Sequence, residues 1–252
     1  MYKFFVNENQ IEGNKIKIIR EDVNHIKNVL RLEKEEKICV CNKEKAISFL
    51  CKIIDFNNEF VLCEIIEDII DTTETNCYIH IFQGLPKSDK FEFIIEKCTE
   101  IGVKEITPVS MKRSIVKFDE KDKSKKLIRW QKIAEVAAKQ SKRDNILKVN
   151  NVINFQNIFE KVKDYDILLV AYEEEKENTL KSILNKLKSE EKDLKITVII
   201  GPEGGIDESE INLCKKNKFI SVSLGKRILR TETVALVVSS IIMYEFNELG
   251  GN

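Results

Sequence analysis

The chain has 252 residues, enough for one large domain or two ordinary ones. Hydrophobic residues make up 42% and charged residues 33%, which is typical of a soluble globular protein with a sizeable core. Positive and negative side chains number 42 each, so the net charge of zero says nothing about a partner. Their distribution is uneven, because residues 112–148 hold thirteen Lys or Arg against five Asp or Glu.

Cysteine and histidine usage argues against a zinc site. The seven cysteines show no repeated C-x-x-C spacing, and the chain has only two histidines, His25 and His80. Cys39 and Cys41 alternate with apolar residues, so we expect both on the buried face of a strand, as reduced thiols. The N-terminus has no apolar signal core, and the apolar run 233–244 is too short to span a bilayer. We therefore expect a cytoplasmic protein without a metal or a membrane partner.

The first seventy residues predict a small β-barrel, because short apolar runs alternate with Asn, Asp and Gly turns. This unit is either a packing module or an RNA-binding appendage that uses Lys27 and Arg31 beside His25. Its strands are predicted at residues 2–6, 15–19, 37–41, 46–54 and 59–66, with one helix near residues 22–30.

An acidic, Thr-rich segment, residues 68–76, is the predicted linker, so we expect one domain over residues 1–72 and another over residues 73–252. Strands and helices alternate after the linker, which predicts an α/β domain with a mostly parallel sheet covered on both faces. Its strands are predicted at residues 78–83, 105–109, 166–171, 196–200 and 219–224, and its helices at residues 89–101, 124–140, 178–187 and 231–246.

Two helices have informative apolar patterns. In the first, one buried face is predicted at helical spacing for Phe91, Ile94, Ile95 and Cys98. The closing helix, residues 231–246, is nearly all apolar and is expected to be buried on most sides. The closing helix has more apolar surface than one core face needs. We therefore expect part of it, or of the helix that contains Phe91 and Ile95, to lie against a second copy of the chain.

Two loops that follow apolar strands form the candidate ligand site. Residues 201–205 read Gly-Pro-Glu-Gly-Gly, and residues 225–233 read Gly-Lys-Arg-Ile-Leu-Arg-Thr-Glu-Thr. Open α/β sheets bind ligands at the carboxyl ends of their strands, and glycine allows close backbone approach. The phosphate-loop Lys-Ser/Thr pair is absent, and Glu203 favours a neutral or cationic ligand. The alternative is a tight strand-to-helix connection capped by Asp207 and Glu210.

Arginines recur at the ends of regular elements, at Arg113, Arg143, Arg227 and Arg230. Each alone is typical of a surface charge. Together with the basic surplus of residues 112–148, they favour a nucleic acid substrate, because guanidinium groups recognise phosphate and carbonyl oxygens. No nucleophile–base pair and no Gly-x-Ser-x-Gly elbow accompanies them.

The chain resembles the bacterial small-subunit ribosomal RNA (uracil-N3)-methyltransferases, the RsmE family of the SPOUT superfamily. The resemblance covers nearly the whole length. It departs from the family's usual residues at Lys3, Lys112 and Leu147, which stand in place of Arg, an acid and Pro. The matching stretches are residues 200–205, 224–233, 97–103, 113–114, 130–135 and 140–143, and His25 with residues 29–31.

The resemblance implies a PUA-like barrel followed by an α/β domain whose last part forms a trefoil knot, which no periodicity predicts. It implies S-adenosylmethionine as methyl donor, a homodimer, and methylation of uridine N3 in the RNA of an assembled or nearly assembled small subunit. Residues expected in catalysis are Arg230, Glu232 and Arg113. Residues expected at the cofactor are Ala171, Ile200, Gly201, Pro202, Glu203, Gly204, Gly205, Leu224, Gly225, Ile228, Leu229 and Thr233. Residues expected at the RNA are Lys3, Lys27, Arg31, Arg113, Arg143 and Arg227.

Two other classes of function stay open. One is a non-catalytic RNA-binding or ribosome-assembly factor that kept the fold, and the other is an α/β enzyme with a different small ligand in the same loops. Intact Glu203 and residues 230–233 argue against a protein that only binds RNA, because such a protein has no need of them.

Overall fold

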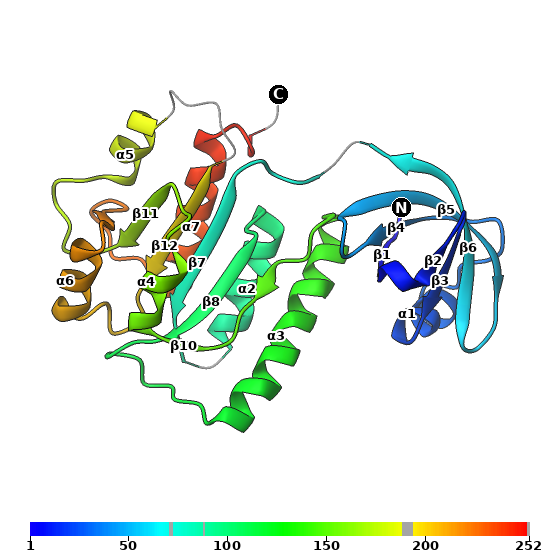
Figure 1. Cartoon of the computed structure of the whole chain (residues 1–252), viewed down its shortest axis with the longest axis horizontal. Coiled ribbons are helices and arrows are strands. Elements are labelled where there is room, and N and C mark those ends of the chain that lie inside the picture. Colours follow the sequence, from blue (N-terminus) through cyan, green and yellow to red (C-terminus); the bar gives the residue numbers. More distant parts are fainter. Residues whose placement is uncertain (71–72, 88, 188–193, 251–252) are drawn as a thin grey trace. The chain divides into compact units, whose positions relative to one another are not determined.

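The computed structural model describes residues 1–70, 73–87, 89–187 and 194–250 (Figure 1). The chain forms two compact units. The first consists of Met1–Glu74 and Ala138–Ile146, and the second of Thr75–Ala137 and Leu147–Asn252. The sequence predicted a single boundary and did not anticipate that Ala138–Ile146 returns to the first unit. Residues 71 and 72 of the predicted linker lie outside the described part of the chain.

The first unit is built on a six-stranded sheet in the order β1-β4-β5-β6-β3-β2, in which only the β1–β4 pairing is parallel. Register shifts between β5 and β6 bend these two long strands, as bulges do. The sheet packs with a short helix around a core that includes Phe4, Ile38 and Val61. Its elements are β1 (Lys3–Val6), β2 (Ile11–Glu12), β3 (Lys15–Ile19), α1 (Glu21–Asn24), a π-helical turn (His25–Val29), β4 (Lys37–Asn42), β5 (Ile47–Phe56) and β6 (Phe60–Ile69).

The second unit is an α/β domain whose described strand pairings are all parallel, as predicted. The strand order is β10-β8-β7-β12-β11-β13, and β9 pairs with β8. The strands are β7 (Tyr78–Gly84), β8 (Glu105–Ser110), β9 (Lys148–Val149), β10 (Ile153–Asn154), β11 (Ile167–Ala171), β12 (Lys195–Ile200) and β13 (Ile220–Val222). The helices are α2 (Lys90–Ile101), α3 (Glu120–Gln140), α4 (Ile158–Lys161), α5 (Leu180–Leu187), α6 (Glu208–Lys216) and α7 (Thr231–Glu245).

Helices cover both faces of this sheet (Figure 1). On one face, α2 packs against α7, and α7 also contacts β7 and β12. On the other, side chains of α4 and α6 such as Ile158 and Ile211 join Phe82 and Ile199 in one core cluster. The predicted buried face of α2 is confirmed, since Phe91, Ile94, Ile95 and Cys98 are all at most 2% exposed.

The closing helix is less buried than the sequence predicted. Ala235, Val238 and Ile242 are fully buried, whereas Tyr244 is 65% exposed and Ile241 is half-buried. One face of α7 therefore fills the core, and its other face stays accessible in the single chain.

Candidate active site

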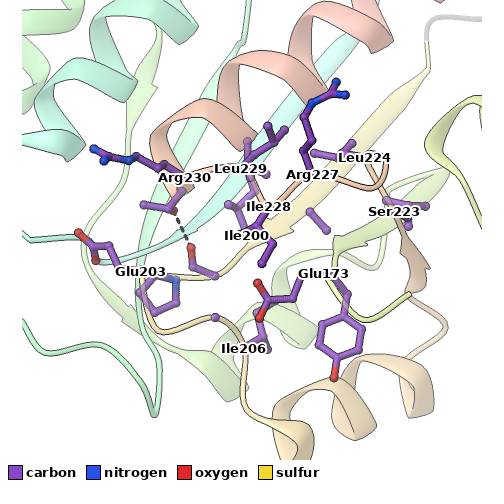
Figure 2. A pocket seen from close by; sticks show the side chains of 18 of the residues that line it. Glu173, Ile200, Glu203, Ile206, Ser223, Leu224, Arg227, Ile228, Leu229 and Arg230 are labelled. Atoms are coloured by element: carbon purple, nitrogen blue, oxygen red, sulfur yellow. Dashed lines mark hydrogen bonds between the residues drawn. The ribbon is translucent and has the colours of Figure 1, made fainter. Parts of the chain in front are cut away.

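A cavity of about 360 Å³ lies at the carboxyl ends of β12, β11 and β13, three neighbouring parallel strands. This is the place where the sequence predicted a ligand, among the loops after Ala171, Ile200 and Leu224. Figure 2 shows side chains from these loops converging on the cavity. Most of the predicted cofactor residues line it, namely Ala171, Ile200, Gly201, Pro202, Glu203, Gly205, Leu224, Gly225, Ile228 and Leu229.

The loop after β12 has a backbone that its glycines make possible. Gly205 has φ +72°, which L side chains rarely adopt, and a Cβ there would lie 3.1 Å from the carboxylate of Glu173. A Cβ on Gly201 would lie 2.8 Å from the side chain of Ile206, so the packing of the loop itself requires a glycine here. The predicted capping box is confirmed, because Asp207 and Glu210 exchange side-chain and backbone hydrogen bonds at the start of α6.

The segment between β13 and α7 supplies the apolar wall of the cavity, from Leu224, Ile228 and Leu229 (Figure 2). Thr231 anchors the end of this segment, since its Oγ1 donates a 2.6 Å hydrogen bond to the carbonyl oxygen of Gly201. The same Oγ1 accepts a 2.8 Å hydrogen bond from Nε2 of Gln83, at the end of β7. These two hydrogen bonds thus connect strand β7, the loop after β12 and the N-terminus of α7 next to the cavity.

One end of the cavity carries opposite charges. Arg230 and Glu203 line it, and Lys90 of α2 reaches it with its Nζ 3.0 Å from Oε1 of Glu203. The Nζ also lies 3.4 Å from Oε2 of Glu232, which is in the first turn of α7. Partial burial opposes ionisation of Glu203, but hydrogen bonds from backbone N–H groups, including that of Lys87, and from Lys90 hold its pKa below the usual value.

The sequence missed several residues of the cavity. Glu173 lines it (Figure 2), and so does Tyr172, although neither residue is among those expected at the cofactor. Lys90 was also missed, because its position 113 residues before Glu203 gives no local signal. The hydrophobic-to-turn transition after β11 was the one signal that could have indicated Tyr172 and Glu173. The other unpredicted lining residues are Ile206, Val222, Ser223, Lys226, Thr231 and Val234.

Four predicted residues stand near the cavity without lining it, namely Gly204, Thr233, Glu232 and Arg113. Arg113 follows β8 and supports the glycine loop from outside, because its Nη1 donates a 3.1 Å hydrogen bond to the carbonyl oxygen of Gly204. Its Nε lies 3.8 Å from the carboxylate of Asp207. The guanidinium remains 48% exposed, so it is both a loop contact and a surface charge.

Two predicted RNA contacts need correction, because Lys3 and Arg143 are buried within the first unit. The Nζ of Lys3 lies 2.6 Å from Asp144 and donates to the carbonyl oxygen of Lys142. The guanidinium of Arg143, 4% exposed, forms a 2.5 Å ion pair with Glu74. A charged side chain is normally expected at the surface. Lys3 and Arg143 are buried because each forms an ion pair with an acid far away in the sequence, Asp144 and Glu74 respectively.

The remaining predicted RNA contacts are accessible. Arg31 and Arg227 are exposed, and Lys27 is half-buried at the surface of the first unit. The Nζ of Lys27 donates to the carbonyl oxygen of Asn57 and to the side chain of Asn58. These side chains can therefore meet a polyanion, while Lys27 already has two neutral partners.

No group of His, Cys, Asp and Glu side chains suited to a metal ion occurs in the described part of the chain. All seven cysteines are buried as free thiols, including Cys39 and Cys41 as predicted. Within the same described residues, no helix is long and apolar enough to cross a membrane.

Comparison with known proteins identifies the class. The model of the RNA methyltransferase domain matches residues 73–243, and that of the RNA methyltransferase PUA domain matches residues 18–66. The ribosomal RNA small subunit methyltransferase E of Bacillus subtilis (strain 168) is 35% identical over 256 residues, covering 100% of each chain. The protein of that name from Mesomycoplasma hyopneumoniae (strain 232) is 37% identical over 236 residues, covering 94% of this chain and 96% of its own.

A solved structure agrees with these relatives. The ribosomal RNA small subunit methyltransferase E of Neisseria gonorrhoeae, bound to S-adenosyl methionine, has a TM-score of 0.84 and 27% identity, with 97% of each chain covered. The fold and the cavity thus define an RNA methyltransferase with a PUA domain. Within that class, the chain belongs to the ribosomal RNA small subunit methyltransferase E family, which confirms the family that its sequence resembles.

Proposed function

We propose that this chain transfers a methyl group from S-adenosylmethionine to N3 of a uridine in small-subunit ribosomal RNA. The observation that carries the proposal is the cavity at the carboxyl ends of β12, β11 and β13, which combines an apolar wall with a charged end. Family membership supports both the cofactor and the class of RNA.

The residues of the cavity fit this cofactor. Ile200, Leu224 and Ile228 offer an apolar surface to an adenine ring, and the volume of about 360 Å³ lies within the range of ligand pockets. Glu173 and Glu203 bring negative charge, which suits a ligand with a sulfonium and an ammonium group and repels a phosphate-rich one. When bound, the cofactor supplies an electrophilic methyl carbon.

Methylation would form one bond, between N3 of uracil and the methyl carbon, and would break two, the methyl–sulfur bond of the cofactor and the N3–H bond. The electron pair of the methyl–sulfur bond would stay on sulfur, and the N3 proton would pass to solvent. In-line orientation of N3 and the methyl carbon gives most of the acceleration, so the chain's first task is positioning. A stacked base must also be turned out of its stack to reach the cavity.

We assign Arg230 to the charge that develops on the uracil carbonyl oxygens. As the N3 proton leaves, negative charge spreads onto these oxygens, and a fixed guanidinium stabilises that state more than the neutral base. Arg230 lines the charged end of the cavity and points away from its apolar wall (Figure 2). Glu232, in the first turn of α7, acts beside it through Lys90, and Arg113 holds the glycine loop.

Contact with RNA is assigned to Lys27, Arg31 and Arg227, whose charges are accessible. The first unit, matched by the PUA model, would then be an RNA-binding domain. A ribosomal substrate implies that the protein works where ribosomes are assembled, in the cytoplasm.

A trefoil knot is proposed for the segment between β13 and α7. Ser223 pairs with Thr179 at one side of this segment, and Thr231 bonds the loop after β12 at the other. The two ends of this segment are thus held against loops that precede it in sequence, after which α7 packs on α2. This arrangement supports a threaded chain.

A homodimer is proposed through the accessible face of α7. Tyr244 is 65% exposed, and Ile241 and Tyr244 line an apolar hollow that extends to Leu180 of α5 and Leu224. Since Leu224 also lines the cofactor cavity, dimerisation there would cover part of the cavity. Sedimentation should show a dimer at micromolar concentration, and a stable monomer would refute this assignment.

Ligand binding tests the proposal against its alternatives. S-adenosylmethionine and its demethylated product should each raise the melting temperature, because ligands that bind only the native state stabilise it by mass action. NAD and ATP serve as controls for a different small ligand in the same loops. Absence of a shift at saturating S-adenosylmethionine, with RNA binding retained, would favour the non-catalytic RNA-binding factor.

A further inference from the structure

Lys90 is shared by two carboxylates from different elements, Glu203 at the charged end of the cavity and Glu232 close to it. Its Nζ lies 3.0 Å from Oε1 of Glu203, in the loop after β12, and 3.4 Å from Oε2 of Glu232, in α7. The three side chains are 31%, 29% and 16% exposed, so water screens them only in part. The group carries one positive and two negative charges.

The second contact is an ion pair without a hydrogen bond. Oε2 of Glu232 is buried and lacks a hydrogen-bond partner among the described residues, so Lys90 is the cation that offsets its charge. Hydrogen bonding to Glu203 is the largest cause that raises the pKa of Lys90, which keeps the ammonium charged. Loss of this one charge would leave two carboxylates unneutralised at the charged end of the cavity.

The two forms of the cofactor differ by one charge at sulfur. S-adenosylmethionine is a sulfonium, and S-adenosylhomocysteine is a neutral thioether. A carboxylate near the sulfur favours the sulfonium, and a cation that neutralises this carboxylate removes the preference. Tight binding of the sulfonium itself would also lower the ground state more than the transition state, in which that charge disappears.

We propose that Lys90 is a positioning residue that sets the affinity ratio between S-adenosylmethionine and S-adenosylhomocysteine, by offsetting one of the two negative charges of Glu203 and Glu232. The inference rests on the proposed function and goes beyond it, because it names the residue that balances substrate cofactor against product. Lys90 acts through the two carboxylates and needs no contact with the ligand.

The test is calorimetric titration of both ligands into the purified full chain at low ionic strength. Lys90→Met should raise the preference for S-adenosylmethionine over S-adenosylhomocysteine at least about threefold, because one positive charge is lost at the charged end of the cavity. Lys90→Arg should keep the wild-type ratio. Adding Glu203→Gln to Lys90→Met restores the net charge and should return the ratio toward that of the wild type.

Lys97→Met is the matched control. Lys97 lies on the same helix, is 32% exposed, and pairs with Glu96 and Glu100 at 2.8 and 2.7 Å, but it does not line the cavity. The ratio should therefore stay unchanged in this variant. If Lys90→Met does not fold, Lys90→Gln removes the same charge, keeps a hydrogen-bond donor and should give the same change in ratio.

The outcomes separate the two claims. If a folded Lys90 variant loses affinity equally for both ligands, Lys90 has only a structural role and the inference is overturned. An affinity ratio unchanged from the wild type would overturn it as well. Failure of the wild-type chain to bind either ligand would instead overturn the proposed function.

Discussion

The hydroxyl of Thr231 donates a hydrogen bond to the carbonyl oxygen of Gly201, 30 positions earlier in the sequence, and accepts one from the side-chain amide of Gln83. All three residues lie at or beside the carboxyl ends of strands β7 and β12. Thr231 is only 6% exposed, so its hydrogen bonds are not exchanged with solvent. This contact fixes the loop that carries Leu224, Ile228 and Arg230 onto the sheet.

Thr231→Val should therefore destabilise the chain and loosen the cavity. Valine keeps the shape but removes both hydrogen bonds of the hydroxyl, and the buried carbonyl oxygen of Gly201 is left with only a 3.4 Å contact from Nε2 of Gln83, which costs about 1–3 kcal/mol. The free energy of unfolding measured with urea should fall by that amount. Thr233→Val on the same helix is the control, and equal stabilities of the two variants would contradict the role of the Thr231 hydroxyl.

Arg230→Ala should slow methyl transfer while the cofactor binds almost as before. We expect at least about a tenfold lower single-turnover rate, roughly 1.4 kcal/mol, because the guanidinium acts on charge that develops in the transition state. Arg227→Ala, three residues earlier in the same loop, should instead weaken RNA binding and reduce its salt dependence. A normal single-turnover rate in Arg230→Ala would show that the catalytic assignment is wrong.

Arg143→Ala should act on stability, in contrast to the RNA contact that the sequence predicted. Its removal leaves Glu74 with a buried, uncompensated charge, and loss of one partner of such a pair costs about 3–5 kcal/mol. Arg129→Ala is the control, because Arg129 is 62% exposed and pairs with Glu92 at 2.7 Å. We expect less than about 1 kcal/mol for that surface pair. If urea unfolding shows that Arg143→Ala and Arg129→Ala lose similar amounts of the free energy of unfolding, the structural role of Arg143 is contradicted.

His80 should make the second unit sensitive to mild acid. Burial lowers the pKa of His80 to about 4, and the carboxylate of Glu105, 3.9 Å away, offsets only part of this effect. Its ring nitrogens lie 2.7 Å from the hydroxyl of Tyr165 and 2.8 Å from that of Thr107. The unfolded chain, with a pKa near 6.5, takes up the proton first, so stability is lost as pH falls below about 6.5.

This single group should lower the free energy of unfolding by about 2 kcal/mol between pH 7 and pH 5. His80→Gln lacks the titration and should show a correspondingly weaker dependence over that interval. If the free energy of unfolding depends on pH in the same way in the wild type and in His80→Gln, His80 is not the group responsible, whatever the absolute stabilities of the two proteins. The measurement is urea unfolding at fixed pH values, which keeps the same observable throughout.

Local patterns predicted much of the fold and the place of the site. Apolar patterns identified the longer strands and the buried face of α2, but not the two-residue strands β2, β9 and β10. The Asp207–Glu210 spacing identified a capping box that the structure contains. The cavity followed from where apolar strands end. These features depend on neighbours in sequence, which is why they can be recognised there.

Pairings between distant residues could not be predicted. Nothing beside Lys3 or Arg143 indicates that Asp144 and Glu74 will bury them, since a charge alone favours the surface. The two partners of Lys90 lie far along the chain, Glu203 in the loop after β12 and Glu232 in the first turn of α7. The sequence likewise gave no sign that Ala138–Ile146 groups with the first unit.

The most direct test of the account is methyl transfer to small ribosomal subunits that lack the modification. Purified chain with isotope-labelled S-adenosylmethionine should place one labelled methyl group per subunit, and mass spectrometry of the nucleosides should assign it to N3 of a uridine. Omission of the cofactor should abolish the product. A chain that binds S-adenosylmethionine and the subunit yet leaves every uridine unlabelled would contradict the central claim.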